Sequence, residues 1–479
     1  MKKWLSMSFT VLAVASCQSP EVEQTDPRPN IIYIIADDLG YGDVGVYGQQ
    51  YIATPNLDKL AAGGMRFTQH YAGSTVCAPS RAVLMTGKHT GHSVVRGNRE
   101  IKPEGQFPMA DSVYTLAEMF VSQGYSTAAF GKWGLGYPAS EGDPNRQGFD
   151  TFFGYNCQRH AHTYYPDYLW SNQTKVGIIQ NTEGEQEIHS ANLIQDQILH
   201  YLRARGRIDA SVDRQPFFLF LPMTMPHAAL QVPDSNRLVY EGKFEEEPQP
   251  DGYYPGVEKP KSTFAAMVSL VDTHVGQIVQ VLDSLGIREN TLIMFTSDNG
   301  PHVEGGADPE FFGSSGPYRG VKRDLYEGGI RVPFIVNWPG RVAAGSTSEH
   351  VSAFWDIFPT MAELIGGAPP TEADGISLYP TLLGASDQQE HPFLYWEFHE
   401  QGGKQAVRQG KWKGVRLNVA REGEPLVELY DLENDPAETQ NLASEFPEKM
   451  AELTQLMEDS HNKDVNWPLY FVDRQEFAE

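Results

Sequence analysis

Cysteine and basic residues are scarce in this chain. Only three of its 479 residues are cysteines, at positions 17, 77 and 157, too few for a disulfide framework. Lys and Arg total 37 against 62 Asp and Glu, which gives a formal net charge of −25. Because an acidic surface repels a phosphate backbone, we expect no nucleic-acid partner. An anionic substrate would need a local basic pocket within this acidic surface.

Internal repeats and low-complexity tracts are also lacking. The hydrophobic fraction is 40%, with aromatic residues spread along the chain, which is typical of a globular protein. The length of 479 residues predicts either two to three domains or one large α/β body with a smaller appendage.

The N-terminus predicts export. Lys2 and Lys3 precede an apolar run that ends near Ser16, which is typical of a secretory signal and too short to span a membrane. The run leads to Cys17 in a pattern similar to a bacterial lipobox. Residues 1–17 would be the lipoprotein signal peptide, and the polar residues 18–29 a tether. The alternative is ordinary cleavage near Ala15, with Cys17 incidental.

These features predict a bacterial lipoprotein in the periplasm, at the outer membrane or at the cell surface. Its only membrane contact would be a lipid on Cys17.

Four buried strands are predicted from continuous apolar runs. They cover residues 30–36, 126–130, 216–221 and 291–296. Helical patterns at 54–63, 114–123 and 264–285 alternate with them. This alternation predicts an α/β fold, a large doubly wound mixed sheet flanked by helices. In such sheets ligands bind beyond the carboxyl ends of the strands.

The pattern changes after about residue 383. Short alternating segments at 393–398 and 413–417 precede a helical pattern at 447–460. We therefore expect a catalytic domain over 30–383 and a small C-terminal α+β subdomain with an antiparallel sheet over 384–479.

Acidic and amide residues follow two of the predicted strands directly. Asp37 and Asp38 follow the first, and Asp298 and Asn299 follow the last. Hard oxygen donors with three negative charges favour Ca²⁺ or Mg²⁺ over a soft metal.

A more specific motif begins at Cys77 and reads Cys-Ala-Pro-Ser-Arg, ending at Arg81. It is similar to the C-x-P-S-R signature of the type I, formylglycine-dependent, arylsulfatase-like sulfatases of the alkaline phosphatase superfamily. The resemblance extends to Asp37-Asp38, to Gly131-Lys132-Trp133, and to the blocks at 297–300 and 327–333, all in the family's order. It covers nearly the whole mature chain.

The resemblance implies hydrolysis of sulfate esters, with sulfated carbohydrate (polysaccharide or its oligosaccharides) as the expected partner. Cys77 would be oxidised to formylglycine by a formylglycine-generating or anaerobic sulfatase-maturating enzyme. One hydroxyl of the hydrated aldehyde would attack sulfur and displace the alcohol, and the other would then expel sulfate and regenerate the aldehyde.

The resemblance also implies roles for other residues. One Ca²⁺ would be held by Asp37, Asp38, Cys77, Asp298 and Asn299. Arg81 would polarise the nucleophile, Lys132 and Lys322 would bind the sulfate and the leaving oxygen, and His227 would be the general acid.

Two positions depart from the family pattern. One is Lys88, where the family usually has arginine, and the charge is retained there. Many members have histidine where this chain has Gly134, which leaves open the base that releases sulfate. His160 or His162 could replace it, or could hold the loop or touch substrate.

Further substrate contacts are predicted on polar or aromatic segments. Arg96 and Asn98 lie in a polar loop that could line the substrate subsite. Tyr164, Tyr165 and Trp170 would either stack on a sugar ring or pack in the core.

Three alternatives remain at this point. The chain could be a phosphoester or phosphonate-ester hydrolase of the same superfamily, or a surface lipoprotein that binds sulfated glycans without turnover. Cys77 could also form a disulfide with Cys157, which would remove it from catalysis.

The lipid anchor can be tested by fractionation. Cys17→Ala in the full-length chain should move the protein from the membrane fraction to the soluble fraction, because the acylated sulfur is lost. Cys157→Ala is the matched control and should stay with the membrane. Retention of the Cys17→Ala protein in the membrane fraction would contradict the lipobox interpretation.

Overall fold

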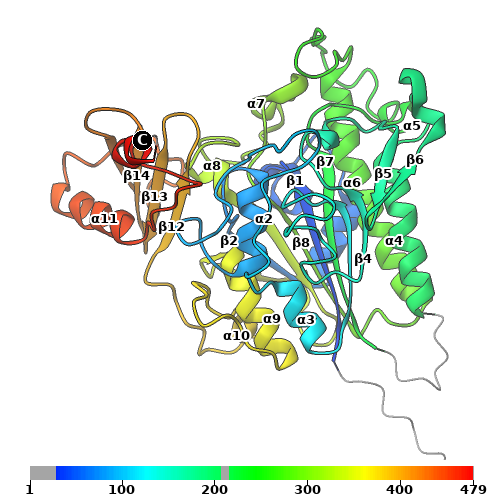
Figure 1. Cartoon of the computed structure of the whole chain (residues 1–479), viewed down its shortest axis with the longest axis horizontal. Helices are drawn as coiled ribbons and strands as arrows, with labels where there is room; N and C mark the ends of the chain where they lie inside the picture. Colours follow the sequence, from blue (N-terminus) through cyan, green and yellow to red (C-terminus); the bar gives the residue numbers. More distant parts are fainter. Residues whose placement is uncertain (1–27, 207–214, 478–479) are drawn as a thin grey trace, which may run out of the picture.

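The computed structural model describes residues 28–206 and 215–477. The predicted signal peptide, Cys17 and residues 18–27 of the predicted tether lie outside these ranges. Within them, a large central sheet has helices on both faces, and a smaller sheet lies to one side (Figure 1).

The large sheet has eleven strands in the described part of the chain. In order across the sheet they are β10 (Ser346–Ser348), β2 (Met65–Tyr71), β9 (Arg331–Asn337), β8 (Thr291–Ser297), β1 (Asn30–Asp37), β7 (Phe217–Pro226), β3 (Ser126–Lys132), β4 (Thr151–Tyr155), β5 (Tyr168–Ser171) and β6 (Thr174–Gly177), with β11 (Ser352–Ala353) paired to β2. The central pairs β8–β1, β1–β7 and β7–β3 are parallel, whereas β9 runs antiparallel to β2 and β8. The predicted mixed sheet is therefore confirmed.

Helices of very different length connect these strands. They are α1 (Pro55–Ala62), α2 (Cys77–Thr86), α3 (Leu116–Ser122), α4 (Ser190–Gly206), α5 (Asp234–Arg237), α6 (Pro260–Ser284), α7 (Pro309–Phe312), α8 (Glu327–Ile330), α9 (Ile357–Ile365), α10 (Tyr379–Leu382), α11 (Pro447–Asp459) and α12 (Phe471–Glu476). Short 3₁₀ turns are η1 (Tyr41–Asp43), η2 (Gly45–Tyr47), η3 (His160–His162), η4 (Ile179–Gly184), η5 (Glu304–Gly306) and η6 (Phe354–Asp356).

The continuous apolar sequence of β1 follows from burial on both faces of the sheet. Ile31 and Ile35 belong to the core cluster that includes residues of α2, α3 and α9. Ile32 and Ile34 belong to the opposite cluster, which includes residues of α1, α4 and α6. Because successive side chains of a strand point to opposite faces, a strand covered on both sides cannot alternate with polar residues.

Helix α6 is the one described helix that is long and apolar enough to cross a membrane by length and composition. Its most apolar window is 67% buried inside the fold. Its apolar residues therefore pack in the core beside α1 and α4.

The second sheet is antiparallel, as predicted, in the order β12 (Leu394–Phe398), β13 (Lys404–Gln409), β14 (Trp412–Leu417) and β15 (Leu426–Asp431). Its strands alternate between two environments. Leu394 and Trp396 join the core of the large body, whereas Tyr395 packs with residues of α11. The exact domain boundary at residue 383 stays a prediction.

Buried ion pairs join the two sheets. Lys413 Nζ on β14 lies 2.9 Å from Glu327 Oε1 and 2.8 Å from Glu438 Oε1, and all three side chains are fully buried. Burial acts to raise the pKa of Glu327, but the charges of Lys413 and Arg331 outweigh it and lower that pKa to about 2. The lysine thus supplies the counter-charge for two buried acids.

Replacement of this lysine tests the junction. Lys413→Met should lower the free energy of unfolding by about 3–5 kcal/mol, because buried Glu438 loses its paired cation and buried Glu327 loses one of its paired cations. Urea denaturation measures the change. Lys411→Met, which removes an exposed partner of Asp431, is the control and should cost much less. Equal losses in the two variants would contradict this account of the junction.

Candidate active site

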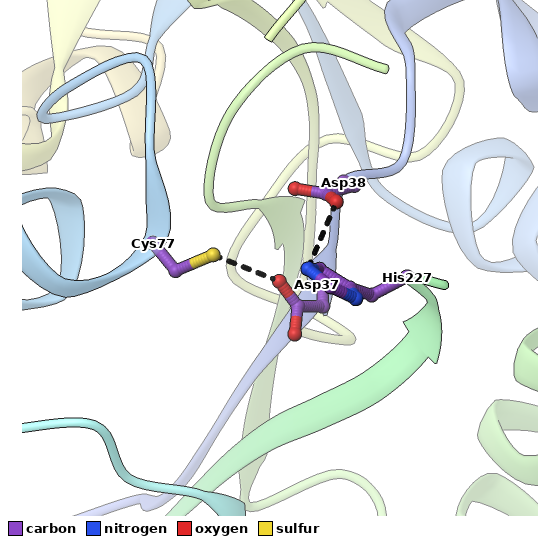
Figure 2. A group of neighbouring side chains, drawn as sticks. All are labelled: Asp37, Asp38, Cys77 and His227. Carbon is purple, nitrogen blue, oxygen red and sulfur yellow. Dashed lines mark hydrogen bonds and ion pairs between the residues drawn. The ribbon is translucent and has the colours of Figure 1, made fainter. Parts of the chain in front are cut away.

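The carboxyl ends of neighbouring strands bring the predicted residues together. Asp37 is the last residue of β1 and Asp38 follows it, His227 follows β7, and Cys77 is the first residue of α2. Figure 2 shows these four side chains converging, with Cys77 directed at Asp37 and His227 at Asp38. Cys77 Sγ lies 3.3 Å from Asp37 Oδ1, and His227 Nε2 lies 3.6 Å from Asp38 Oδ2.

The two acidic clusters are bound to each other. The backbone amide of Asp38 donates to Asp298 Oδ1 at 3.1 Å, and Asn299 Nδ2 donates to Asp38 Oδ1 at 2.7 Å. Asp37, Asp38, Asp298 and Asn299 are all completely buried. Since β1 and β8 are parallel neighbours, their ends place these oxygen atoms in one group.

Three cations neutralise this group. Lys132 Nζ lies 2.6 Å from Asp37 Oδ2 and 3.6 Å from Cys77 Sγ. Lys322 Nζ lies 2.7 Å from Asp38 Oδ2. Arg81 donates through Nε and Nη2 to Asp298 Oδ2, at 3.1 and 2.8 Å. Cys77 is therefore surrounded by fixed positive charge.

The pKa values of the acids reflect their neighbours. Burial acts to raise the pKa of Asp37, but the charges of Lys132 and Arg81 outweigh it and hold that pKa well below its usual range. Burial and the nearby charge of Asp37 raise the pKa of Asp298 to about 7. Both lysines stay protonated, because the carboxylates beside them raise their pKa despite burial.

The Cys77 thiol and the neighbouring histidines are held uncharged. Burial, reinforced by Asp37, raises the pKa of the Cys77 thiol, which is the reverse of an activated catalytic cysteine. Burial and the charges of Lys322 and Lys132 hold the pKa of His227 well below its usual range. Burial and the charge of Lys132 lower the pKa of His162 to about 4.

A cavity of about 570 Å³ opens above Cys77. It has Lys322, His227 and His162 on its walls, and Tyr253 and Tyr254 beside them. Its remaining lining residues are Asn98, Glu100, Gln106, Gln158, Arg159, Gln249, Pro250, Gly252, Glu304, Gly305 and Arg323. Carboxamides, charged groups and aromatic rings thus line the cavity together with Cys77.

The donor set fits a hard divalent cation. Asp37, Asp38, Cys77 and His227 offer ligand atoms within 4.8 Å of one another. The predicted set also contains Asp37, Asp38 and Cys77, but it has Asp298 and Asn299 instead of His227. The buried oxygen Asn299 Oδ1 has no hydrogen-bond partner among the described residues. Because carboxylate and amide oxygens are the ligands of Ca²⁺ and Mg²⁺, we prefer the oxygen set.

A second group, Asp38, His302 and Glu304, also meets the distance criterion. Both ring nitrogens of His302 are already used, Nε2 by the Pro226 carbonyl and Nδ1 by the amide of Glu304. Glu304 itself pairs with Arg323 at 2.6 Å. These contacts favour a structural role for this second group.

The structure places two of the four predicted substrate-binding residues in the cavity lining and two outside it. Asn98 and His162 line the cavity, and Asn98 Oδ1 accepts from the amide of Ala78. Arg96 is not placed in the cavity, because its guanidinium is buried against Glu397 at 3.0 Å. His160 also lies outside the lining, stacked on Tyr168 at 4.4 Å.

The three aromatic residues predicted to stack on a sugar or to pack in the core do not line the cavity. Tyr164 is fully buried, and its hydroxyl donates to the carbonyls of Thr224 and His227, so it packs in the core. Tyr165 and Trp170 are absent from the described lining of the cavity.

Cys77 and Cys157 are both free thiols, which excludes the alternative disulfide.

Several cavity residues escaped prediction. Arg323 adjoins the predicted Lys322, and Glu304 lies a few residues beyond Asn299, so proximity to a motif was their only signal. Tyr253 and Tyr254 lie on a segment with no regular hydrophobic period. Their approach to His162, with ring centroids 5.8 and 5.2 Å away, is a tertiary contact.

Comparison with known families decides what this site belongs to. Residues 29–368 match the family model described as sulfatase, and residues 318–464 match one described as N-sulphoglucosamine sulphohydrolase, C-terminal. This chain belongs to the sulfatase family. It is therefore a sulfuric ester hydrolase.

Individual relatives agree with this assignment. Arylsulfatase G of Rattus norvegicus is 31% identical over 91% of this chain and 87% of its own length. N-acetylgalactosamine-6-sulfatase of the same species is 30% identical over 91% and 86%. The crystal structure of Ps i-CgsB in complex with k-i-k-neocarrahexaose is 27% identical, with a TM-score of 0.78 over 94% of this sulfatase and 98% of that chain.

The fit to a hard cation generates a binding prediction. Ca²⁺ added to chelator-treated protein should raise the melting temperature, because an ion bound only by the folded state stabilises it. Asn299→Leu should abolish most of this rise, since it removes a buried oxygen ligand. Asn236→Leu, outside the cluster, is the control. A full calcium response in Asn299→Leu would contradict the oxygen set.

Proposed function

We propose that this sulfatase removes sulfate from carbohydrates, with formylglycine made from Cys77 as nucleophile and one Ca²⁺ as cofactor. The observation that carries the proposal is the arrangement around Cys77. Lys132 and Lys322 flank a buried side chain at the floor of a polar cavity, above a cluster of oxygen ligands. A sulfate ester is anionic, so its reacting group needs such fixed positive charge.

The residues of this chain divide the work by position. Lys132, 3.6 Å from Cys77 Sγ, would bind an oxygen of the sulfate. Lys322, on the cavity wall, would bind the sulfate and the leaving oxygen. Arg81 is fixed by Asp298 and by the carbonyl of Lys132, so it would orient the first residue of its own helix.

Two groups complete this chemistry when present. Formylglycine at position 77, installed by a maturating enzyme, supplies a hydrated aldehyde as nucleophile and a route to release sulfate. A calcium ion on Asp37, Asp38, Asp298 and Asn299 would offset the crowded carboxylates and polarise a sulfate oxygen.

His227 is the residue we propose as general acid. Its Nδ1 contacts the carbonyl of Ala228, so Nε2 faces Asp38 and the cavity. Action as an acid requires a proton on Nε2, which an anionic substrate would favour by adding negative charge beside the ring. His162 stacks on His227 with centroids 5.1 Å apart and would align it.

Carbohydrate is the substrate class that the surroundings favour. The cavity carries carboxamides together with the exposed ring of Tyr253. Amides recognise hydroxyl groups, and aromatic faces pack on sugar rings. The similar protein Ps i-CgsB was solved with an oligosaccharide, and another relative is named for a sulfated amino sugar.

We also propose that the chain is exported and anchored through a lipid on Cys17. This proposal rests on the N-terminal sequence alone.

A substrate panel tests the proposed function. Matured protein is incubated with sulfated mono- and oligosaccharides, and free sulfate is measured by ion chromatography. Cys77→Ala should release none, because it cannot be oxidised to the aldehyde. Cys157→Ala, which alters the other buried cysteine, is the matched control and should retain activity.

The same assay separates the alternatives. Mass spectrometry first establishes the aldehyde at position 77. If that protein releases no sulfate from any sugar but hydrolyses phosphate or phosphonate esters, the superfamily alternative replaces the proposal. Binding of sulfated glycans without any turnover would favour the non-catalytic interpretation.

A further inference from the structure

Gln158 occupies space that a side chain at position 134 would otherwise fill. Gly134 has φ +78°, and a Cβ built on it would lie 2.2 Å from Gln158 Nε2. Only glycine combines this backbone conformation with such a close approach. Many family members have histidine at position 134. In this chain that position is glycine, and the side chain of Gln158 lies against it at the wall of the Cys77 cavity.

The amides of Gln158 and Gln106 are buried without complete hydrogen bonding. Gln158 is 8% exposed and Gln106 is 2% exposed. Gln158 Nε2 and Gln106 Oε1 have no hydrogen-bond partner among the described residues. An unsatisfied buried amide costs about 1–3 kcal/mol. Because both residues line the cavity, rotation of each terminal amide toward a bound ligand would give these two buried atoms partners.

Backbone contacts hold the two glutamines on neighbouring segments. Cys157 Sγ lies 3.4 Å from the carbonyl oxygen of Gly105. The amide of Gln106 donates to the carbonyl of Gly136 at 3.3 Å, and the amide of Gly134 donates to Asn156 at 3.1 Å. The three segments therefore form one wall that presents both carboxamides.

We infer that Gln106 and Gln158 bind a hydroxyl group of the sugar beside its sulfated carbon, and thereby set substrate specificity. The inference rests on the proposed carbohydrate substrate. A sugar hydroxyl both donates and accepts, so it satisfies an unpaired NH and an unpaired oxygen together. A sulfate group only accepts, so it has no donor for Gln106 Oε1. The pair is suited to the sugar rather than to the reacting sulfate.

The test compares a sugar with a substrate that has no hydroxyl. kcat and KM are measured for the best carbohydrate of the sulfate-release panel and for 4-nitrophenyl sulfate. Gln158→Met and Gln106→Met should each lower kcat/KM for the sugar about 10- to 100-fold, because a polar site loses its contact with the hydroxyl. Their kcat/KM for 4-nitrophenyl sulfate should stay within about threefold of wild type.

Gln173→Met is the control, because it alters an exposed amide that lies outside the lining of the cavity. It should change neither substrate by more than about threefold. Formylglycine content and melting temperature are measured for every variant. If Gln158→Met does not fold, Gln106→Met carries the same comparison.

The outcomes separate this inference from the proposed function. Equal losses on sugar and aryl sulfate would overturn it, because the glutamines would then act on the reacting group. Unchanged sugar kinetics in both variants would also overturn it. A wild-type enzyme that cleaves 4-nitrophenyl sulfate but no sugar would overturn the substrate class and this inference together.

Discussion

Buried charge is the constraint on which the arrangement of this protein depends. Asp37 and Asp38 are completely buried. Their partners Lys132 and Lys322 expose only a few per cent of their surface. Moving each ion out of water costs several kcal/mol, and only close pairing offsets that cost. The ends of β1 and β3 and the loop that carries Lys322 must therefore meet at hydrogen-bond distance. A substrate that enters this array finds its charges already oriented, which is what electrostatic catalysis requires.

The second sheet shapes the site without reaching it. Arg96, in the loop that leads to Asn98, is held by Glu397 of β12, and Glu397 also binds His399 and His461. Lys404 of β13 donates to the carbonyl of Arg323 at 2.7 Å, beside Lys322 of the cavity wall. Two walls of the cavity thus depend on the C-terminal subdomain, which explains why a residue expected to contact substrate holds a loop instead.

Local patterns were reliable where one physical requirement dominates. A strand buried on both faces must be apolar throughout, so the runs at 30–36 and 291–296 identified β1 and β8 and located the polar residues after them. The motif from Cys77 to Arg81 likewise marked a structured segment, which forms the first half of α2. By contrast, the two histidines at 160 and 162 are equivalent in sequence, yet the 3₁₀ turn that contains them directs only His162 into the cavity.

Periodicity and contiguous motifs in the sequence suffice for the fold class, for the oxygen-rich strand ends and for the position of the Cys77 motif, because each of these is a local property of the chain. Which distant groups meet depends on the folded chain. Gln106 and Gln158 share a wall because three separate segments pack together there, and Gly134 leaves room for the second of them. Such contacts depend on side-chain packing between elements far apart in the chain, and no local pattern of residues records them.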